Sequence, residues 1–166
     1  AALAADLLHH LLHLLVLLDD PADILDLGTG TGAIALALKS ERPQDQVLAV
    51  EFNSDAVALA QYNSERLCLP IEVRHGSWFT PLDALRFDMI VANPPYIDAT
   101  DPHLHQGDLR FEPASALIAE QAGMADLRYL ITHAPHYLHP HGYLLLEHGW
   151  QQGDLVQASF IEAGYQ

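Results

Sequence analysis

Three features of the sequence predict an α/β fold with a mainly parallel sheet. Short apolar segments that resemble buried strands alternate with longer segments of good helix formers, which is the order of βαβ units. A glycine-rich turn, Gly28 to Gly32, directly follows the first of these strands. The tetrapeptide Asn93-Pro94-Pro95-Tyr96 directly follows another. Ligands of open α/β sheets bind beyond the carboxyl ends of the strands, so both segments are predicted at the binding edge.

The chain begins with an apolar segment, Leu3 to Leu18, which lacks Gly and Pro and is rich in helix formers. Leucines occur nearly all round this predicted helix, so it should be mostly buried against the sheet or against another chain. His9 and His13 lie one helical turn apart and could present two imidazoles to a metal ion. The sequence suggests no third ligand nearby, so we expect solvated positions and no metal site. We divide the chain into this N-terminal apolar helix, residues 1–20, and a core of residues 21–166.

The core is predicted to contain five strands and four helices. The strands are expected at Ile24 to Leu27, Val47 to Val50, Ile71 to Arg74, Phe87 to Ala92 and Tyr143 to Leu146. The helices are expected at Ala33 to Ser40, Ala56 to Leu67, Met124 to His133 and Gln151 to Ala163. Ser54 and Asp55 can cap the second helix. Residues 97–113 are polar and without hydrophobic period, as in long functional loops.

The composition limits the class of protein. The chain has 166 residues, the size of one domain, and 50% of them are hydrophobic. Seven Lys and Arg against 22 Asp and Glu give a formal net charge of −15, which would repel a phosphate backbone. We therefore expect no direct nucleic-acid partner.

A single cysteine, Cys68, excludes an intrachain disulfide and suits a reducing compartment, and we expect it in the core. The apolar run Leu7 to Leu18 is too short to span a bilayer comfortably and lacks the features of a signal peptide. We expect a soluble, cytoplasmic protein with no membrane partner.

The glycine turn and two acidic residues predict a nucleoside site. Gly28, Gly30 and Gly32 let the backbone turn tightly and approach a ligand closely. Asp26 is an acid in an otherwise apolar strand, so it should pair with loop N–H groups or with a ligand cation. Glu51 ends the next strand, where an acid accepts hydrogen bonds from ribose hydroxyls. We predict a site for an adenosine-containing cofactor.

The residues of the turn leave the identity of that cofactor open. Gly28, Gly30 and Ala33 also satisfy the G-x-G-x-x-A pattern of nicotinamide dinucleotide sites. Asp26 favours the amino group of a methionyl moiety over a pyrophosphate, and a sulfonium cofactor suits an acidic site.

The tetrapeptide Asn93-Pro94-Pro95-Tyr96 has the chemistry of a pocket for a planar amine or amide nitrogen. The two prolines remove two N–H donors and end the strand, which leaves the neighbouring carbonyls free to accept. The Asn93 side-chain oxygen and one such carbonyl can accept from an NH2 group, and Tyr96 offers an aromatic face.

Together these motifs resemble a known family. The segment from Asp26 to Gly32, Asp-Leu-Gly-Thr-Gly-Thr-Gly, resembles the first motif of class I S-adenosylmethionine-dependent methyltransferases. The Asn93 tetrapeptide resembles the catalytic motif of those members that methylate planar nitrogens. With Gly107 to Pro113 and Leu146 to Gly149, the pattern resembles the release factor glutamine-N5 methyltransferases, the HemK/PrmC family. The resemblance covers about residues 22–165.

The resemblance implies a Rossmann-like class I methyltransferase sheet with strand order 3-2-1-4-5, to which the N-terminal helix is added. It implies that S-adenosyl-L-methionine is the cofactor, and it alone places Trp78 beside the adenine. The predicted cofactor-binding residues are Asp26, Gly28, Thr29, Gly30, Thr31, Gly32, Glu51, Trp78 and Asn93. The predicted catalytic residues are Asn93, Pro94 and Tyr96, and the predicted substrate-binding residues are Asn93, Pro94, Pro95 and Tyr96.

The substrate implied by the resemblance is the glutamine in the Gly-Gly-Gln motif of peptide chain release factors, whose methylation belongs to translation termination. An amide nitrogen is a poor nucleophile because its lone pair is delocalised. Hydrogen bonds from its two N–H groups to Asn93 and the Pro94 carbonyl would orient it and favour loss of planarity.

The sequence departs from the family at both ends. Neither the family's N-terminal helical domain nor its Pro-, Arg- and acid-containing segment is recognisable before Pro21, and the family's last two strands do not follow the final helix. We expect a fragment or a redesigned core in which cofactor binding is more secure than turnover. Self-association through the edge of the fifth strand or the apolar helix is a further expectation.

Two other functions stay open from the sequence. Adenine-N6 nucleic-acid methyltransferases use the same tetrapeptide, because adenine also presents a planar exocyclic amine. The net charge of −15 disfavours this function. The third possibility is a cofactor-binding core without turnover.

Overall fold

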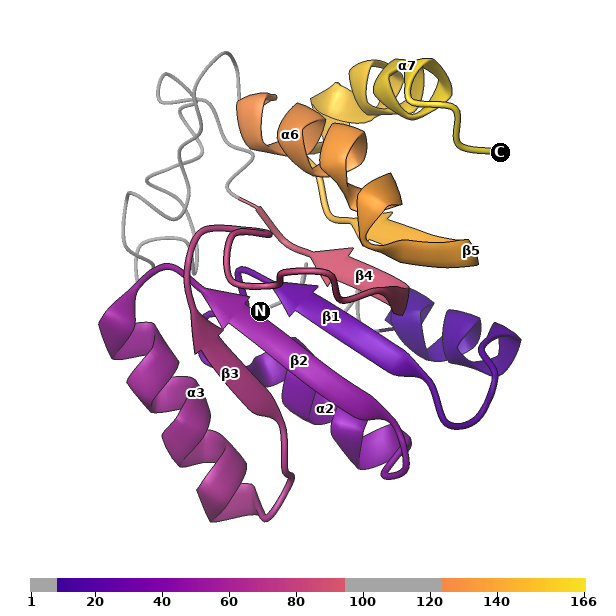
Figure 1. Ribbon diagram of the computed structural model, residues 1–166. Helices are drawn as coiled ribbons and strands as arrows, with labels where there is room; N and C mark the ends of the chain where they lie inside the picture. Colours follow the sequence, from indigo (N-terminus) through magenta and orange to yellow (C-terminus); the bar gives the residue numbers. More distant parts are fainter. Residues whose placement is uncertain (1–8, 95–123) are drawn as a thin grey trace. The chain divides into compact units, whose positions relative to one another are not determined.

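The structure is a computed structural model that describes residues 9–94 and 124–166 (Figure 1). The chain forms two compact units. The first, here called the sheet unit, comprises residues 1–92 and 136–145. The second, here called the helical unit, comprises residues 93–135 and 146–166.

Five strands form one sheet in the order β3-β2-β1-β4-β5 (Figure 1). Their bounds are β1 (Asp23–Leu27), β2 (Gln46–Glu51), β3 (Glu72–His75), β4 (Phe87–Ala92) and β5 (Leu138–Leu146). Strand β1 pairs in parallel with β2 and β4, and β2 pairs in parallel with β3. Leu27 lies opposite both Val50 and Ala92, so the carboxyl ends of the three central strands are level. The predicted fold class and strand order are confirmed.

Two helices of the sheet unit, α2 (Ala33–Glu41) and α3 (Ser54–Leu67), follow β1 and β2. The prediction that Ser54 and Asp55 cap α3 is wrong. Asn53 is the cap, because its extended backbone lets its Oδ1 accept from Asp55 N at 2.9 Å and Ala56 N at 3.2 Å. The expectation that Cys68 lies in the core is also wrong: it is exposed at the left-handed C-cap of α3, where the chain turns out of the helix.

Strand β5 begins at Leu138, five residues before the predicted start at Tyr143. Pro140 interrupts the sequence pattern but not the strand, because β5 is the edge of the sheet and a missing N–H is tolerated there. Gly142 lets β5 approach β4 closely. A Cβ at that position would lie 3.1 Å from the Asp88 carbonyl oxygen. Self-association through this edge stays a prediction.

The described part of the N-terminal segment is helical over residues 9–14 and continues as the 3-10 turn η1 (Leu15–Leu17). Leu11 and Leu15 are buried in the same core as strand residues of β1, β2 and β4. Val16 and Leu17 are 80% and 56% exposed, so the expectation that this segment is mostly buried is wrong for these two residues. Both lie in the 3-10 turn that follows the α-helix. The division of the chain at residue 20 stays a prediction.

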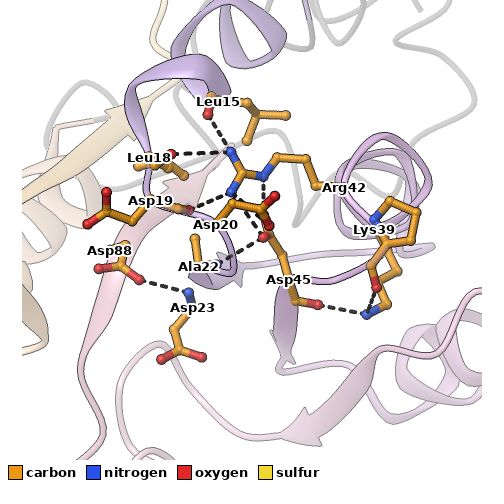
Figure 2. Close-up of polar contacts among 11 residues, drawn as sticks. Leu15, Leu18, Asp19, Asp20, Ala22, Asp23, Lys39, Arg42, Asp45 and Asp88 are labelled. Carbon is orange, nitrogen blue, oxygen red and sulfur yellow. Dashed lines mark hydrogen bonds and ion pairs between the residues drawn. The ribbon is translucent and has the colours of Figure 1, made fainter.

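Arg42, in an ion pair with the buried Asp45, joins the N-terminal segment to the rest of the sheet unit (Figure 2). Asp45, which directly precedes β2, is 0% exposed, and its Oδ2 lies 2.6 Å from Arg42 Nε. Its Oδ1 accepts from Ala22 N at 2.9 Å. The Arg42 guanidinium also donates to the carbonyl oxygens of Leu15, at 2.6 Å, and of Asp19. One cation therefore joins α2, the end of the N-terminal segment and the start of β2.

The helical unit contains α6 (Ala125–His133), η5 (Trp150–Gln152) and α7 (Gly153–Glu162), while the 3-10 turn η4 (Ala134–His136) leads from α6 towards β5. Helices α6 and α7 pack together, and the Tyr165 hydroxyl donates to the Ile131 carbonyl at 3.1 Å. Both predicted helices are therefore present. The last one starts later than predicted because its first residues form the 3-10 turn.

No helix within residues 9–94 and 124–166 is long and apolar enough to cross a membrane. In the same residues, no three His, Cys, Asp or Glu side chains gather as a metal site. The predicted functional loop, residues 97–113, lies outside the described residues.

Candidate functional site

The candidate site is built on the glycine turn between β1 and α2. The N–H groups of Gly28 and Thr29 both donate to the Val50 carbonyl, at 2.8 and 3.2 Å. The turn is thereby fixed to the carboxyl end of β2. Gly28, Gly30 and Gly32 have φ values of +70°, +56° and +83°, a region that favours glycine. The sequence-predicted turn thus needs glycine for its backbone conformation.

Asp26 lies beneath the turn and is 1% exposed. Its Oδ2 accepts from the Thr29 hydroxyl at 2.6 Å and from Ala35 N at 3.1 Å. Its Oδ1 is buried and has no hydrogen-bond donor among the described residues. Burial raises the pKa of Asp26 to about 6, the charge of Glu51 adds to the increase, and the two hydrogen bonds oppose it. A buried carboxylate oxygen without a partner suits a ligand cation.

Glu51 is the last residue of β2 and is half-buried beside the same turn. Its Oε2 accepts from Gly30 N at 2.9 Å, and its Oε1 accepts from Asn53 N at 2.8 Å. Each carboxylate oxygen has a second lone pair. Two backbone N–H groups therefore orient Glu51 while each oxygen can still accept one hydroxyl, as a ribose diol would require.

Trp78 lies against the glycine turn from the turn that follows β3. Its ring atom Cζ3 is 3.4 Å from the position that a Cβ of Gly28 would take. The indole is half-buried, and the Trp78 backbone is left-handed with φ +47°. A Cβ at Gly28 would thus lie at an ordinary contact distance from the indole, and the positive φ is what favours glycine there. The sheet unit thus brings together Asp26, Glu51, Trp78 and all five residues of the glycine turn.

The remaining predicted site residues belong to the other unit or lie outside the described residues. Asn93 is half-buried and Pro94 is buried, and both belong to the helical unit. They directly follow β4, whose carboxyl end is level with that of β1. Pro95 and Tyr96 lie outside the described residues, as does the segment Gly107 to Pro113.

Sequence reasoning missed two residues, one that contacts the glycine turn and one that directly follows Glu51. Asn63 of α3 donates from Nδ2 to the Thr31 carbonyl at 3.0 Å. The available signal was its residue type, because Asn is a poor helix former inside a helix. Phe52 directly follows Glu51 and is exposed, and its carbonyl lies 2.8 Å from His75 Nε2. The sequence does show this aromatic residue directly after Glu51, the acid that is predicted to bind the ribose hydroxyls.

Most of the chain matches the model of one known protein family. The model of the methyltransferase small domain matches residues 5–121. The chain belongs to that family. As a methyltransferase small domain, it carries the predicted methyltransferase architecture, and two solved structures share its fold. A methyltransferase from Pyrococcus furiosus matches with a TM-score of 0.69 at 20% identity, over 96% of this chain and 73% of that one. A ribosomal protein L11 methylase from Lactobacillus delbrueckii matches with a TM-score of 0.70 at 20% identity, over 98% and 69%.

Curated relatives support the resemblance found in the sequence of this methyltransferase small domain. It is 59% identical over 143 residues to the release factor glutamine methyltransferase of Salmonella typhimurium, covering 86% of this chain and 52% of that protein. It is 55% identical over 148 residues to the release factor glutamine methyltransferase of Escherichia coli, covering 89% and 53%. The predicted resemblance to that family is confirmed, and these relatives give no support to the adenine-N6 alternative. The chain spans about half the length of the curated relatives it matches.

Proposed function

We propose that the chain binds S-adenosylmethionine and is the catalytic core of a protein-glutamine N5-methyltransferase. The observation that carries the proposal is the open Oδ1 of Asp26 under a glycine turn whose other side is bonded to Glu51. This arrangement offers one acceptor for an ammonium group and two for a ribose diol. The names of the curated relatives supply the substrate class, a glutamine of a release factor.

The residues of the turn fit the cofactor group by group. Asp26 would accept the ammonium of the methionyl moiety, Glu51 would accept the ribose hydroxyls, and Trp78 would lie beside the adenine. Thr29, Thr31 and Asn93 complete the proposed binding set. The cofactor supplies a methyl group on a sulfonium centre, which is electrophilic without help from the protein. A nicotinamide dinucleotide would set a pyrophosphate against Asp26, which disfavours it.

The substrate amide would be held by Asn93 and Pro94, with Pro95 and Tyr96 as the proposed remaining walls of its pocket. The Asn93 side-chain oxygen and the Pro94 carbonyl would each accept one N–H of the glutamine amide. These two acceptors would orient the amide nitrogen. The bound cofactor would supply the methyl group to that nitrogen and leave as the neutral thioether, and the nitrogen would release one proton to water. The proposed partner is the Gly-Gly-Gln loop of a release factor, and the single cysteine supports a cytoplasmic location.

Calorimetric titration with S-adenosylmethionine and, separately, with NAD tests the cofactor. We expect saturable binding of the sulfonium compound alone, which Gly30→Trp should abolish. Gly164→Trp is the matched control, because Gly164 also has a positive φ and open space around its Cβ position. NAD binding, or binding that survives Gly30→Trp, would contradict the proposal.

Mass spectrometry of a release factor incubated with the chain and S-adenosylmethionine then tests turnover. We expect one added methyl group on the glutamine of the Gly-Gly-Gln motif. Cofactor binding without that product would reduce the proposal to a cofactor-binding core. Methylation of DNA in place of the release factor would support the adenine-N6 alternative.

A further inference from the structure

Helix α3 contacts the glycine turn through two residues one helical turn apart, Ala60 and Asn63. Ala60 is fully buried, and its Cβ lies 3.2 Å from the position that a Cβ of Gly32 would take. Asn63 Nδ2 donates to the Thr31 carbonyl at 3.0 Å. Residues three apart share one face of a helix. The small residue lets α3 approach the turn, and the amide then bonds to the turn's backbone.

The peptide group between Thr31 and Gly32 is held at both ends. Its carbonyl accepts from Asn63, and its N–H donates to the Thr29 carbonyl at 2.9 Å. Because the C=O and N–H of a trans peptide point in opposite directions, fixing the carbonyl also fixes the direction of the N–H. Asn63 and Thr29 therefore together fix the direction in which this peptide group faces.

The chain of hydrogen bonds continues from this peptide to the buried acid. Thr29 accepts from Gly32 N through its carbonyl, and its hydroxyl donates to Asp26 Oδ2 at 2.6 Å. Three hydrogen bonds thus lead from the surface of α3 to the carboxylate whose other oxygen is open. The first two hydrogen bonds share one peptide group and so strengthen each other, while the third depends on them through the position of Thr29.

We propose that Asn63 is a positioning residue for the cofactor: its amide holds the Thr31 carbonyl so that the turn and Asp26 are preorganised for the methionyl and ribose groups. The inference rests on the proposed function and adds to it a residue of α3 that makes no contact with the proposed ligand groups. Asn63 is half-buried at the surface, so its contribution to global stability is small compared with its effect on the turn.

The test compares Asn63→Asp and Asn63→Leu with the wild-type 166-residue chain. Both variants lose the Nδ2 donor, and Asn63→Asp keeps the shape of the side chain. We expect the Kd for S-adenosylmethionine to rise about three- to tenfold, the value of one neutral hydrogen bond. Amide exchange at Gly32 should become faster even without cofactor, because the peptide is then held at one end only. In a methylation assay the KM for the cofactor should rise with kcat unchanged at saturating cofactor.

Gln61→Glu is the matched control, because it makes the same amide-to-acid change at an exposed position of the same helix. It should leave the Kd unchanged, and the melting temperatures of all three variants should stay within about 4 °C of the wild type. An unchanged Kd in folded Asn63 variants would overturn the proposal. If Gln61→Glu lost as much affinity for S-adenosylmethionine as Asn63→Asp, the added charge would explain the effect, and the proposal would also be overturned.

Two further outcomes are decisive. If both Asn63 variants lose the folded state at the assay temperature, Asn63 supports the fold and not the turn, and the proposal is overturned. If the wild-type chain does not bind S-adenosylmethionine, the proposed function fails first and this inference fails with it. The wild-type titration therefore separates the two failures.

Discussion

Among the described residues of the sheet unit, two aspartates are buried, one at each end of the parallel strands, and they differ in what faces them. Asp45 precedes β2 at the amino ends of the strands, and its carboxylate is paired with Arg42 and bonded to Ala22 N. Asp26 lies in β1 near the carboxyl ends, and a hydroxyl and one N–H bind one of its oxygens while the other is open. Both side chains are almost fully buried.

The difference separates an acid used for structure from an acid kept for a ligand. A buried carboxylate needs a compensating cation, and at Asp45 the protein itself supplies one. At Asp26 no described residue supplies one, and the pKa is raised to about 6 by burial. Such a raised pKa in an incompletely bonded group is typical of functional sites. At the amino ends of the strands, Arg42 neutralises the buried acid. At the carboxyl ends, Asp26 has an open oxygen that a cationic group of a ligand could reach.

Removing Arg42, the cation that pairs with Asp45, should have the largest effect on stability. Arg42→Ala would leave the Asp45 carboxylate buried without its cation, and we expect the free energy of unfolding to fall by about 3–5 kcal/mol. Urea denaturation measures the loss. Arg74→Ala is the control, because its ion pair with Glu72 joins side chains that are 31% and 60% exposed, and it should cost about 1 kcal/mol or less. Equal losses in the two variants would contradict the assignment of Asp45 as a structural acid.

Neutralising the other acid should have the opposite effect on stability. Asp26→Asn removes a carboxylate whose burial opposes folding above its raised pKa, so stability at neutral pH should increase by about 1–3 kcal/mol. The same change removes the counter-charge of the proposed ammonium group, and the Kd for S-adenosylmethionine should rise about 10- to 100-fold. Urea denaturation and calorimetry on one sample of each protein test both halves. A variant that loses both stability and affinity would contradict the comparison.

The pH dependence of stability should distinguish Asp26 from other acids. Its pKa rises from 3.8 to about 6 on folding, so the native state holds this proton more tightly than the unfolded state does. The stability that Asp26 contributes is therefore full below its unfolded pKa, falls as the pH rises towards about 6, and is constant above. The stability difference between Asp26→Asn and wild type should grow over this range. A difference independent of pH would contradict the raised pKa.

The smallest expected effect is a shift of that pH range. The hydrogen bond from Thr29 lowers the pKa of Asp26, so Thr29→Val should raise this pKa further. Cofactor affinity in the wild type should fall as the pH is lowered through about 6, because protonated Asp26 no longer attracts an ammonium group. In Thr29→Val this fall should begin at higher pH. Calorimetry at several pH values follows it, and an unmoved profile would remove Thr29 from the network.

The sequence predicted most of the sheet unit because local pattern and backbone chemistry agree there. The strand Phe87–Ala92 has the predicted bounds, and the glycine turn with Asp26 and Glu51 lies together as expected. The errors arise where tertiary contacts override local pattern. Pro140 is accepted inside β5 because that strand is an edge, a property that depends on strand order and not on the sequence nearby.

Side-chain contacts between distant segments were the part that could not be predicted. The amide of Asn63 and the Thr31 carbonyl meet only after α3 has packed beside the turn. Arg42 is one of seven scattered basic residues, and nothing in its neighbourhood marks it as the partner of the N-terminal segment. The proposed roles of Asn93, Pro94, Pro95 and Tyr96 rest on motif and resemblance and stay proposals.

The glycine turn limits which residues descendants of this chain can accept. At position 28 the limit is set by the backbone: φ is +70°, and a Cβ there would lie at an ordinary contact distance, 3.4 Å, from the Trp78 ring. Loss of the tryptophan in a later lineage would therefore leave the preference for glycine at position 28 unchanged. At position 32 glycine has two causes, because φ is +83° and a Cβ would lie only 3.2 Å from the Cβ of Ala60.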